Sequence, residues 1–514
     1  MDFIKLPIFT YALVKHKLQN DFKLSKNQDM PFVIINVLLT LAALLVAIPV
    51  VLILCMYKYL ISFILYMKYD KKYRYIMPGI DSFCNREYRC LINSVLFVEY
   101  KKSPSELLED LRERINNVLH GTHEKISFTR HRFMGLDFYL KRDFNVEELV
   151  RPMIKGECTQ LSSSAFAEII SIEDKLVMPG NDMGMFEVSV GQQPMAEDVY
   201  NSSNVYPILF RMHHSLCDGI SFINAFYTTF IDNELPAIEK SMKDKIIENM
   251  IDLKLATQTT TIKNNMFSLR DHNSLRGYNL LEDKHFVWTT KLNSEILLKV
   301  KKIRKYYGTS FASTITACLT SSLHEHLAKS NEKIPDTILA GLVVLPKPCT
   351  FQWGKMRTEF VNEFGAVAIQ LPISVDSVKN PIVTRIKLVQ KEYETIQKTI
   401  DCQLNYWFIK FLIPMLPAPV TDYLKKIPSI TMGISNLPGG PEFSLFNDDG
   451  KVIDNLNFPP NSTGTGIHVA IITYGSYLRL SITVDKSVVR KFTDVQEILD
   501  NTTKYIEDLA DNCK

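Results

Sequence analysis

The sequence lacks an excess of charge of either sign. Among its 514 residues, 59 are Lys or Arg and 56 are Asp or Glu, which leaves a formal net charge of only +3. Proteins that bind nucleic acid concentrate positive charge to neutralise phosphates, so no nucleic-acid partner is expected. Glycine (20) and proline (23) are too scarce for a fibrous or low-complexity chain. The 22% of charged and 46% of apolar residues are typical of a globular protein.

Paired cysteines are also missing. The nine Cys are odd in number and widely spaced, and no C-x-x-C occurs. A disulfide framework or a structural zinc site is therefore not expected, and a reducing compartment is favoured. Two histidine pairs, His120/His123 and His324/His326, have no Cys or carboxylate set beside them that would complete a metal site. We predict no bound metal.

One long hydrophobic run is present near the N-terminus. Residues 32–67 contain a single charge, Lys58, and residues 32–57 contain none. As a helix, residues 32–57 would be about 39 Å long, enough to cross a hydrocarbon core of about 30 Å. A buried core helix seldom stays apolar on every face over such a length. A cleaved signal peptide would be shorter and begin nearer the N-terminus. We therefore predict a membrane anchor over residues 31–70.

Two arrangements of this anchor are compatible with the sequence. One is a single span over residues 32–57 followed by an interfacial stretch at residues 59–69; the other is a hairpin bent at Pro49. The flanking Lys and Arg residues are nearly balanced, so the positive-inside rule does not decide between them, although the balance fits a hairpin slightly better than a single span. A second apolar run at residues 404–420 is interpreted either as a core helix ending at Pro414 or as a membrane-dipping surface.

The spacing of apolar residues predicts interleaved strands and helices along the rest of the chain. Strands are expected at residues 90–100, 186–190, 206–214, 285–292, 337–345, 364–373, 467–474 and 477–484, the last two as a hairpin across Gly475 and Ser476. Helices are expected at residues 103–119, with Ser105 as the cap, and at residues 220–230, 294–305, 310–326 and 381–398. This order predicts an α/β (α+β) fold.

The chain is expected to consist of a globular body with an N-terminal anchor. We predict an N-terminal segment (1–30), the anchor (31–70), an N-terminal half (75–235), a polar crossover linker (236–282), a C-terminal half (283–495) and a tail helix (496–514).

Residues 211–219 (RMHHSLCDG) carry the strongest chemical signal. On a strand, His213 and His214 point to opposite faces, so they cannot readily chelate one metal. His214 ends the strand where a turn begins, and a neutral imidazole there can take a proton from a hydroxyl. Two structural histidines would be the ordinary interpretation of any adjacent pair. Cys217 as a nucleophile is a weaker alternative, because no base is specifically placed for it.

The residues after the histidine pair suggest how the turn is built. Asp218 could order the turn or pair with Arg211. Gly219 permits a tight turn or a close approach of the backbone.

The pattern H-H-x-x-x-D-G, after an apolar strand and before a helix, resembles the acyl-CoA-dependent acyltransferase superfamily of chloramphenicol acetyltransferase and peptide-synthetase condensation domains. Within it, the chain is most similar to the wax ester synthase/diacylglycerol acyltransferase family. Residues 77–84 (MPGIDSFC) resemble that family's opening segment, and residues 435–441 (SNLPGGP) its C-terminal N-x-P-G-P motif, with Gly440 in place of Pro. The resemblance continues through residues 464–485 and covers about residues 75–495.

The resemblance implies two chloramphenicol-acetyltransferase-like subdomains around a central tunnel. It makes His214 the general base that activates an acceptor alcohol for attack on the acyl-CoA thioester, with His213 and Asp218 in orienting roles. Gly219 and Arg211 would support the motif. Ser435 and Asn436 are candidates for stabilising the oxyanion. No permanently bound cofactor is implied; acyl-CoA is a co-substrate.

The resemblance and the anchor together favour a lipid substrate. The expected acceptor is a fatty alcohol or diacylglycerol, giving wax ester or triacylglycerol. The alternatives are a catalytically silent lipid-binding or lipid-droplet-organising protein, and an acyltransferase for a small alcohol or amine. One departure bears on acceptor choice: the family often has an Asn-Asp pair where this chain has Phe311 and Ala312.

The expected location is a membrane with the catalytic part facing the cytosol, most simply the endoplasmic reticulum, with lipid droplets or the plasma membrane as alternatives. The dispersed cysteines and the need for cytosolic acyl-CoA favour this topology. Three glycosylation triplets, at Asn201, Asn461 and Asn501, are accordingly interpreted as unmodified. The oligomeric state is left open.

Overall fold

The structure is a computed structural model. It describes residues 30–87, 89–119, 123–200, 202–229, 271–277, 279–290, 293–345, 359–375, 381–399, 401–426, 430–461 and 464–513. Most of the predicted crossover linker and His120 lie outside these ranges. The predicted strands and helices are present with ends shifted by a few residues, and the mixed α/β fold is confirmed.

The N-terminal half is built on a six-stranded sheet whose order is β12-β13-β2-β7-β6-β5. These strands are β2 (Leu91–Tyr100), β5 (Val150–Pro152), β6 (Phe186–Val190), β7 (Val205–His213), β12 (Ser444–Leu445) and β13 (Gly450–Phe458). Side chains alternate along β2 and β7, so one sheet face packs on α4 (Pro104–Leu119) and α8 (Gly219–Thr229). The other face packs on α6 (Ser163–Lys175). The cap of α4 is Ser103 rather than Ser105, because Ser103 Oγ accepts from the backbone N–H of Glu106 while the Glu106 carboxylate accepts from the N–H of Ser103.

Short elements connect these strands. They are α3 (Gly79–Asn85), η3 (Glu124–Ser127), α5 (Val146–Leu149) and α7 (Glu197–Tyr200).

Two strands of this sheet come from the C-terminal half. Strand β13 pairs antiparallel with β2 over most of its length, and β12 pairs with β13. The division by sequence at residues 236–282 did not anticipate this exchange. A fully buried ion pair, with 2.9 Å between Arg479 Nη2 and Asp454 Oδ2, joins β13 to the second sheet.

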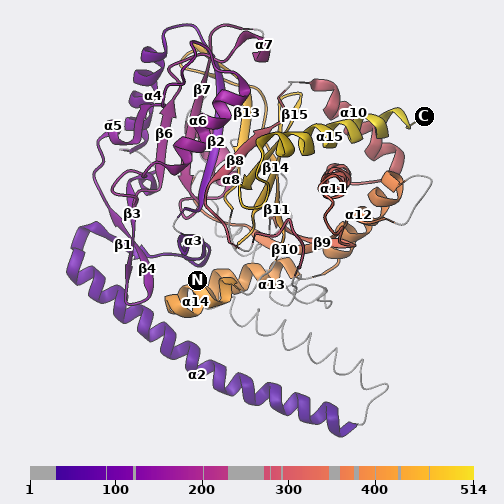
Figure 1. Ribbon diagram of the computed structural model, residues 1–514. Coiled ribbons are helices and arrows are strands. Elements are labelled where there is room, and N and C mark those ends of the chain that lie inside the picture. Colours follow the sequence, from indigo (N-terminus) through magenta and orange to yellow (C-terminus); the bar gives the residue numbers. More distant parts are fainter. Residues whose placement is uncertain are drawn as a thin grey trace.

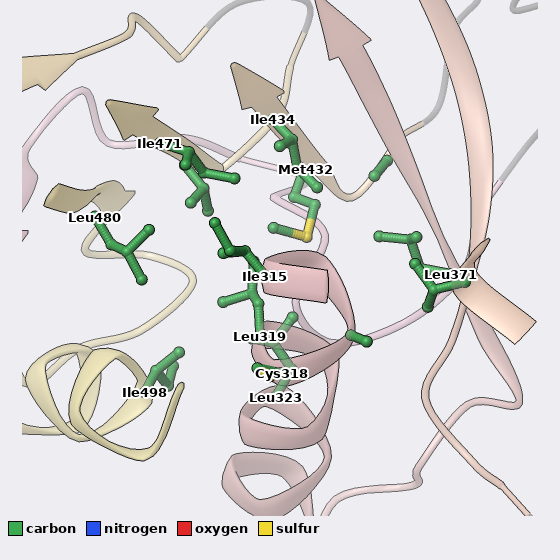
Figure 2. Packing of buried hydrophobic residues seen from close by; sticks show 14 of the residues in the cluster. Ile315, Cys318, Leu319, Leu323, Leu371, Met432, Ile434, Ile471, Leu480 and Ile498 are labelled. Atoms are coloured by element: carbon green, nitrogen blue, oxygen red, sulfur yellow. The ribbon is translucent and has the colours of Figure 1, made fainter. Parts of the chain in front are cut away.

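The second six-stranded sheet has the order β10-β9-β11-β14-β15-β8. Its strands are β8 (Lys284–Trp288), β9 (Thr337–Val344), β10 (Gly365–Pro372), β11 (Met432–Pro438), β14 (Ile467–Tyr474) and β15 (Tyr477–Asp485), and the predicted β14–β15 hairpin is confirmed. One face is covered by α10 (Ser294–Tyr307), α11 (Phe311–Lys329), α12 (Pro381–Gln397) and α15 (Phe492–Asp511). Figure 2 shows Ile315 and Leu319 of α11 among Met432, Ile434 and Ile471 of the sheet. The other face of the sheet faces the N-terminal half of the molecule (Figure 1).

Residues 404–420 take the core position, one of the two alternatives that the sequence left open. Helix α13 (Asp401–Trp407) continues through a π turn, η4 (Phe408–Leu412), and a 3-10 turn, η5 (Ile413–Met415), that contains Pro414. Its apolar side chains, including Trp407 and Ile409, form a buried cluster with Ile80 of α3. Helix α14 (Ala418–Lys426) follows.

The hydrophobic run forms one continuous helix, α2 (Met30–Tyr69), with Pro49 inside it. Its 40 residues correspond to about 60 Å, and it does not turn back at Pro49, so the hairpin alternative is wrong (Figure 1). Within the described residues, one stretch of chain, Pro49–Lys72, is long and apolar enough to cross a membrane.

The C-terminal part of α2 packs on the body rather than standing apart from it. Ile61 and Leu65 are buried against a three-stranded sheet of β1 (Tyr73–Ile76), β4 (Leu136–Lys141) and β3 (Phe128–Phe133), which η2 (Asp70–Lys72) connects to the helix. The Tyr57 hydroxyl donates to the Met134 carbonyl at 2.6 Å. The residues predicted as an interfacial stretch are therefore a docked helix, whose outer side exposes large apolar side chains. Along the C-terminal part of α2 these are Val50, Leu52, Ile53, Met56, Tyr59, Leu60, Phe63, Ile64, Tyr66 and Met67.

Candidate active site

His214 stands at the end of β7, on the wall of a cavity. Its backbone N–H donates to the carbonyl of Cys90, the residue before β2, at 2.7 Å, and its own carbonyl accepts from Asn362 Nδ2 at 2.7 Å. These two bonds fix the main chain at this point between the two halves of the molecule. The imidazole is half-buried, lies against the Phe364 ring with 5.1 Å between centroids, and faces the cavity.

The cavity beside His214 has a volume of about 400 Å³ and is lined by both sheets. Its wall is mostly apolar. Lining side chains from the N-terminal half include Phe83, Ile92 and Ile220, and those from the C-terminal half include Leu342, Phe364, Ile409, Ile430 and Leu437. Such a volume, with few polar groups in an apolar wall, is typical of a site for an organic ligand.

His213 points away from this cavity, as the strand alternation predicts. It is fully buried, with its Nδ1 2.8 Å from Ser215 Oγ and its Nε2 3.2 Å from the Glu87 carbonyl. Its contacts hold the turn that follows β7. Among the residues that the structure describes, no three His, Cys, Asp or Glu side chains lie together as metal ligands would.

Asp218 orders the turn, which was one of its two predicted roles. Its Oδ1 accepts from the N–H of Ser221 at 2.7 Å, at the start of α8, and its Oδ2 accepts from the N–H of Glu363 at 2.7 Å. Burial raises the pKa of this carboxyl above its ordinary value, and the two backbone bonds and the nearby His214 oppose that rise. Asp218 therefore ties the motif to the segment that enters β10.

Arg211 does not pair with Asp218, so the second role predicted for Asp218 is wrong. Arg211 is fully buried, forms an ion pair with Glu187, and donates from Nη2 to the Leu176 carbonyl at 2.6 Å. It stabilises the sheet from the side opposite to the cavity, in keeping with a supporting role.

A network of polar side chains that was not predicted from the sequence contacts the main chain of the motif. Asp81 Oδ2 accepts from Lys125 Nζ at 2.8 Å, and Asp81 Oδ1 accepts from Asn362 Nδ2 at 2.8 Å. Lys125 Nζ also donates to the Leu216 carbonyl at 2.6 Å, inside the motif. The Tyr139 hydroxyl lies 2.9 Å from Asp81 Oδ2. Asp81 belongs to the opening segment quoted above, which was the only signal that could have found it.

Gly219 meets the second half of the molecule at close range. A Cβ at this position would lie 2.8 Å from Leu437 Cδ1, so a larger residue here would displace the end of the Leu437 side chain. Of the two candidates on β11, Ser435 is buried and Asn436 is exposed, and both line the cavity.

Cys217 does not have the surroundings of a nucleophile. It is fully buried and does not line the cavity. Burial raises the pKa of its thiol well above the ordinary value, which disfavours the reactive thiolate.

Two further polar side chains, Asn457 of β13 and His468 of β14, line the cavity and were not predicted. His468 lies against Gly433 of β11, where a Cβ would sit 1.7 Å from its Nε2. Burial, and then the charge of His214, lower the pKa of His468 to about 4. The imidazole of His468 is therefore neutral at neutral pH. Ala312, one of the two residues that replace the expected Asn-Asp pair, also lines the cavity and adds an apolar side chain to its wall.

Comparison with known proteins agrees with this architecture. Residues 361–510 match the family model described as the WS/DGAT C-terminal domain. Comparison with curated protein sequences gives no significant match.

Three solved structures share the fold at low sequence identity. The wax ester synthase/diacylglycerol acyltransferase from Marinobacter aquaeolei VT8 matches with a TM-score of 0.55 and 13% identity, covering 85% of this chain and 99% of that one. The TRI3 trichothecene 15-O-acetyltransferase from Fusarium sporotrichioides matches with a TM-score of 0.56 and 12% identity, covering 85% and 94%. The first condensation domain of the CDA synthetase matches with a TM-score of 0.51 and 10% identity, covering 86% and 98%.

These matches confirm the resemblance drawn from the motifs. The chain has the fold shared by the wax ester synthase/diacylglycerol acyltransferases and the condensation domains, and its residues 361–510 carry a WS/DGAT C-terminal domain.

Proposed function

We propose that this protein is an acyl-CoA-dependent O-acyltransferase that esterifies a fatty alcohol or diacylglycerol, with His214 as the general base. The observation that carries the proposal is the half-buried imidazole of His214 on the wall of a mostly apolar cavity between the two sheets. The WS/DGAT domain over residues 361–510 supports an acyltransferase. A long acyl chain needs such an apolar wall, because burial of its methylene groups provides most of its binding energy.

The reaction would proceed without a covalent acyl-enzyme. The neutral imidazole of His214 takes the proton of the acceptor hydroxyl as its oxygen attacks the thioester carbonyl carbon. The tetrahedral intermediate collapses, the C–S bond breaks, and the CoA thiolate leaves with the proton from the imidazolium. Positioning of two substrates in one cavity supplies much of the acceleration. His213 and Asp218 hold the main chain that carries His214, and no permanently bound cofactor enters the scheme.

The apolar helix α2 suits this substrate class. Fatty alcohols and diacylglycerol reside in membranes, so an enzyme that uses them gains from attachment there. We propose that α2 anchors the protein to a membrane. The first location to examine is the endoplasmic reticulum, with the catalytic part of the protein on the cytosolic side. The protein should then stay in the pellet after alkaline carbonate extraction, and its release into the supernatant would contradict the anchor.

The test is expression of the full chain in cells that lack neutral-lipid synthesis, fed with a labelled fatty acid. Labelled wax ester or triacylglycerol should appear with the wild type and be lost with His214→Ala. His326→Ala, on α11 and outside the cavity lining, is the matched control and should retain product. Product that persists in His214→Ala would refute the base. Acyl-CoA binding without turnover on any alcohol would instead identify a lipid-binding protein.

A further inference from the structure

One polar side chain of the cavity wall is left without a protein partner. Asn457 is only 3% exposed, yet it lines the cavity. Among the described residues, none donates a hydrogen bond to its buried Oδ1. A buried amide with unused hydrogen-bonding capacity is costly to folding, unless a ligand completes it.

The Asn457 amide lies where the His214 motif enters α8. A Cβ built on Gly219 would be 3.6 Å from Asn457 Nδ2, so the amide nitrogen faces the first residue of that helix. The N-terminus of a helix carries partial positive charge, and α8 is 11 residues long. A negative charge that develops between Asn457 and the start of α8 would therefore be stabilised by both.

We propose that the Asn457 amide donates a hydrogen bond to the thioester carbonyl oxygen and stabilises the oxyanion of the tetrahedral intermediate. When the acceptor oxygen bonds to the carbonyl carbon, the π electron pair moves onto the carbonyl oxygen, next to Nδ2. When the C–S bond breaks, that pair re-forms the carbonyl and the thiolate leaves. Asn457 carries no proton away, so its role is electrostatic and complements the proton transfer by His214.

Asn457 fits this task better than Asn436 and His468. Asn436 is exposed, and water can satisfy its amide. His468 is adjacent to Gly433 of β11, whereas Gly219 is adjacent both to Asn457 and to Leu437, which is also on β11. Those two positions on β11 are four residues apart, or about 13 Å. The amide next to the motif is therefore the better placed donor.

The test compares Asn457→Leu, which keeps a similar volume without a donor, with Asn457→Asp, which keeps the shape but replaces the donor with an acceptor. Asn455→Leu is the matched control, because Asn455 is a buried amide two residues earlier on β13 that does not line the cavity. In the acyl-transfer assay, kcat should fall by about 10²–10³-fold in both Asn457 variants, with the KM for acyl-CoA nearly unchanged. The control should retain kcat. Equal kcat in Asn457→Leu and the control would overturn the proposal.

A second readout separates this inference from the proposed function on which it rests. Isotope-edited infrared spectroscopy of carbonyl-labelled acyl-CoA, bound without acceptor, should show a lowered carbonyl stretching frequency in the wild type and its return toward the free value in Asn457→Leu. This arm needs no turnover. If no alcohol is acylated but the frequency shift depends on Asn457, the proposed function fails and the donor stands. If the wild type turns over but the frequency is the same in wild type and Asn457→Leu, the donor assignment fails alone.

Discussion

His468 should make the protein sensitive to mild acid, by an amount that the structure allows us to work out. Its pKa is lowered from 6.5 to about 4 in the folded protein, mainly because the ring is buried. Between those values the unfolded chain binds a proton that the folded chain does not, so stability is intact above pH 6.5 and is lost as the pH falls toward 4. The difference amounts to about 2 kcal/mol by pH 5 and about 3 kcal/mol by pH 4.

The variant His468→Asn isolates this contribution, because Asn cannot take up a proton. Urea-unfolding midpoints of the full chain in detergent micelles, measured from pH 7.5 to 5, would be compared for the two proteins. The variant starts less stable, since it leaves space above Gly433, but it should lose about 2 kcal/mol less than the wild type as the pH falls. The same substitution at His326 is the control and should follow the wild type. Parallel pH profiles for the wild type and His468→Asn would refute the reasoning.

Three further predictions follow from the packing. Gly433→Ala should be destabilising by about 1–3 kcal/mol, because its Cβ would overlap His468 Nε2, and His468→Ala in the same chain should recover most of the loss in unfolding midpoint. Arg479→Met should cost about 3–5 kcal/mol of unfolding free energy, because it leaves the fully buried Asp454 without its counter-ion; a loss below 1 kcal/mol would contradict this. Cys217→Ala should retain acyl transfer, since the thiol does not line the cavity, and loss of turnover with an unchanged fold would restore the nucleophile hypothesis.

Local signals predicted many of the helices and strands and the orientation of the motif, although α6, β11 and β13 were not predicted. The alternation along residues 206–214 placed His213 and His214 on opposite faces, because side chains of a strand alternate whatever surrounds it. The 3.6-residue spacing of the helices was equally local. Ser105 was chosen as a cap in place of Ser103, because both are acceptable cap residues and only the backbone geometry shows which of them meets the N–H of Glu106.

Long-range contacts left no such signal. Strand β13 lies more than 300 residues from its partner β2, and nothing in either segment specifies the other. The bonds from Asn362 to Asp81 and to the His214 carbonyl likewise join separate halves of the chain. Asn457 was missed for the same reason: a lone Asn on a strand is unremarkable until the cavity around it is known. A contact between two distant segments cannot be predicted from the sequence of one of them alone.

The exchange of β13 into the N-terminal sheet has a consequence for biosynthesis. Strand β2 lies in that sheet between β7 and β13, so one edge of β2 has no partner until residues 450–458 have left the ribosome. An open edge of an apolar strand is a template for incorrect pairing during that interval. The N-terminal half therefore cannot finish folding as an independent unit during translation. Synthesis to near the end of the chain is required before the cavity exists, and a truncated product would expose β2 to aggregation and leave no Asn457 beside the motif.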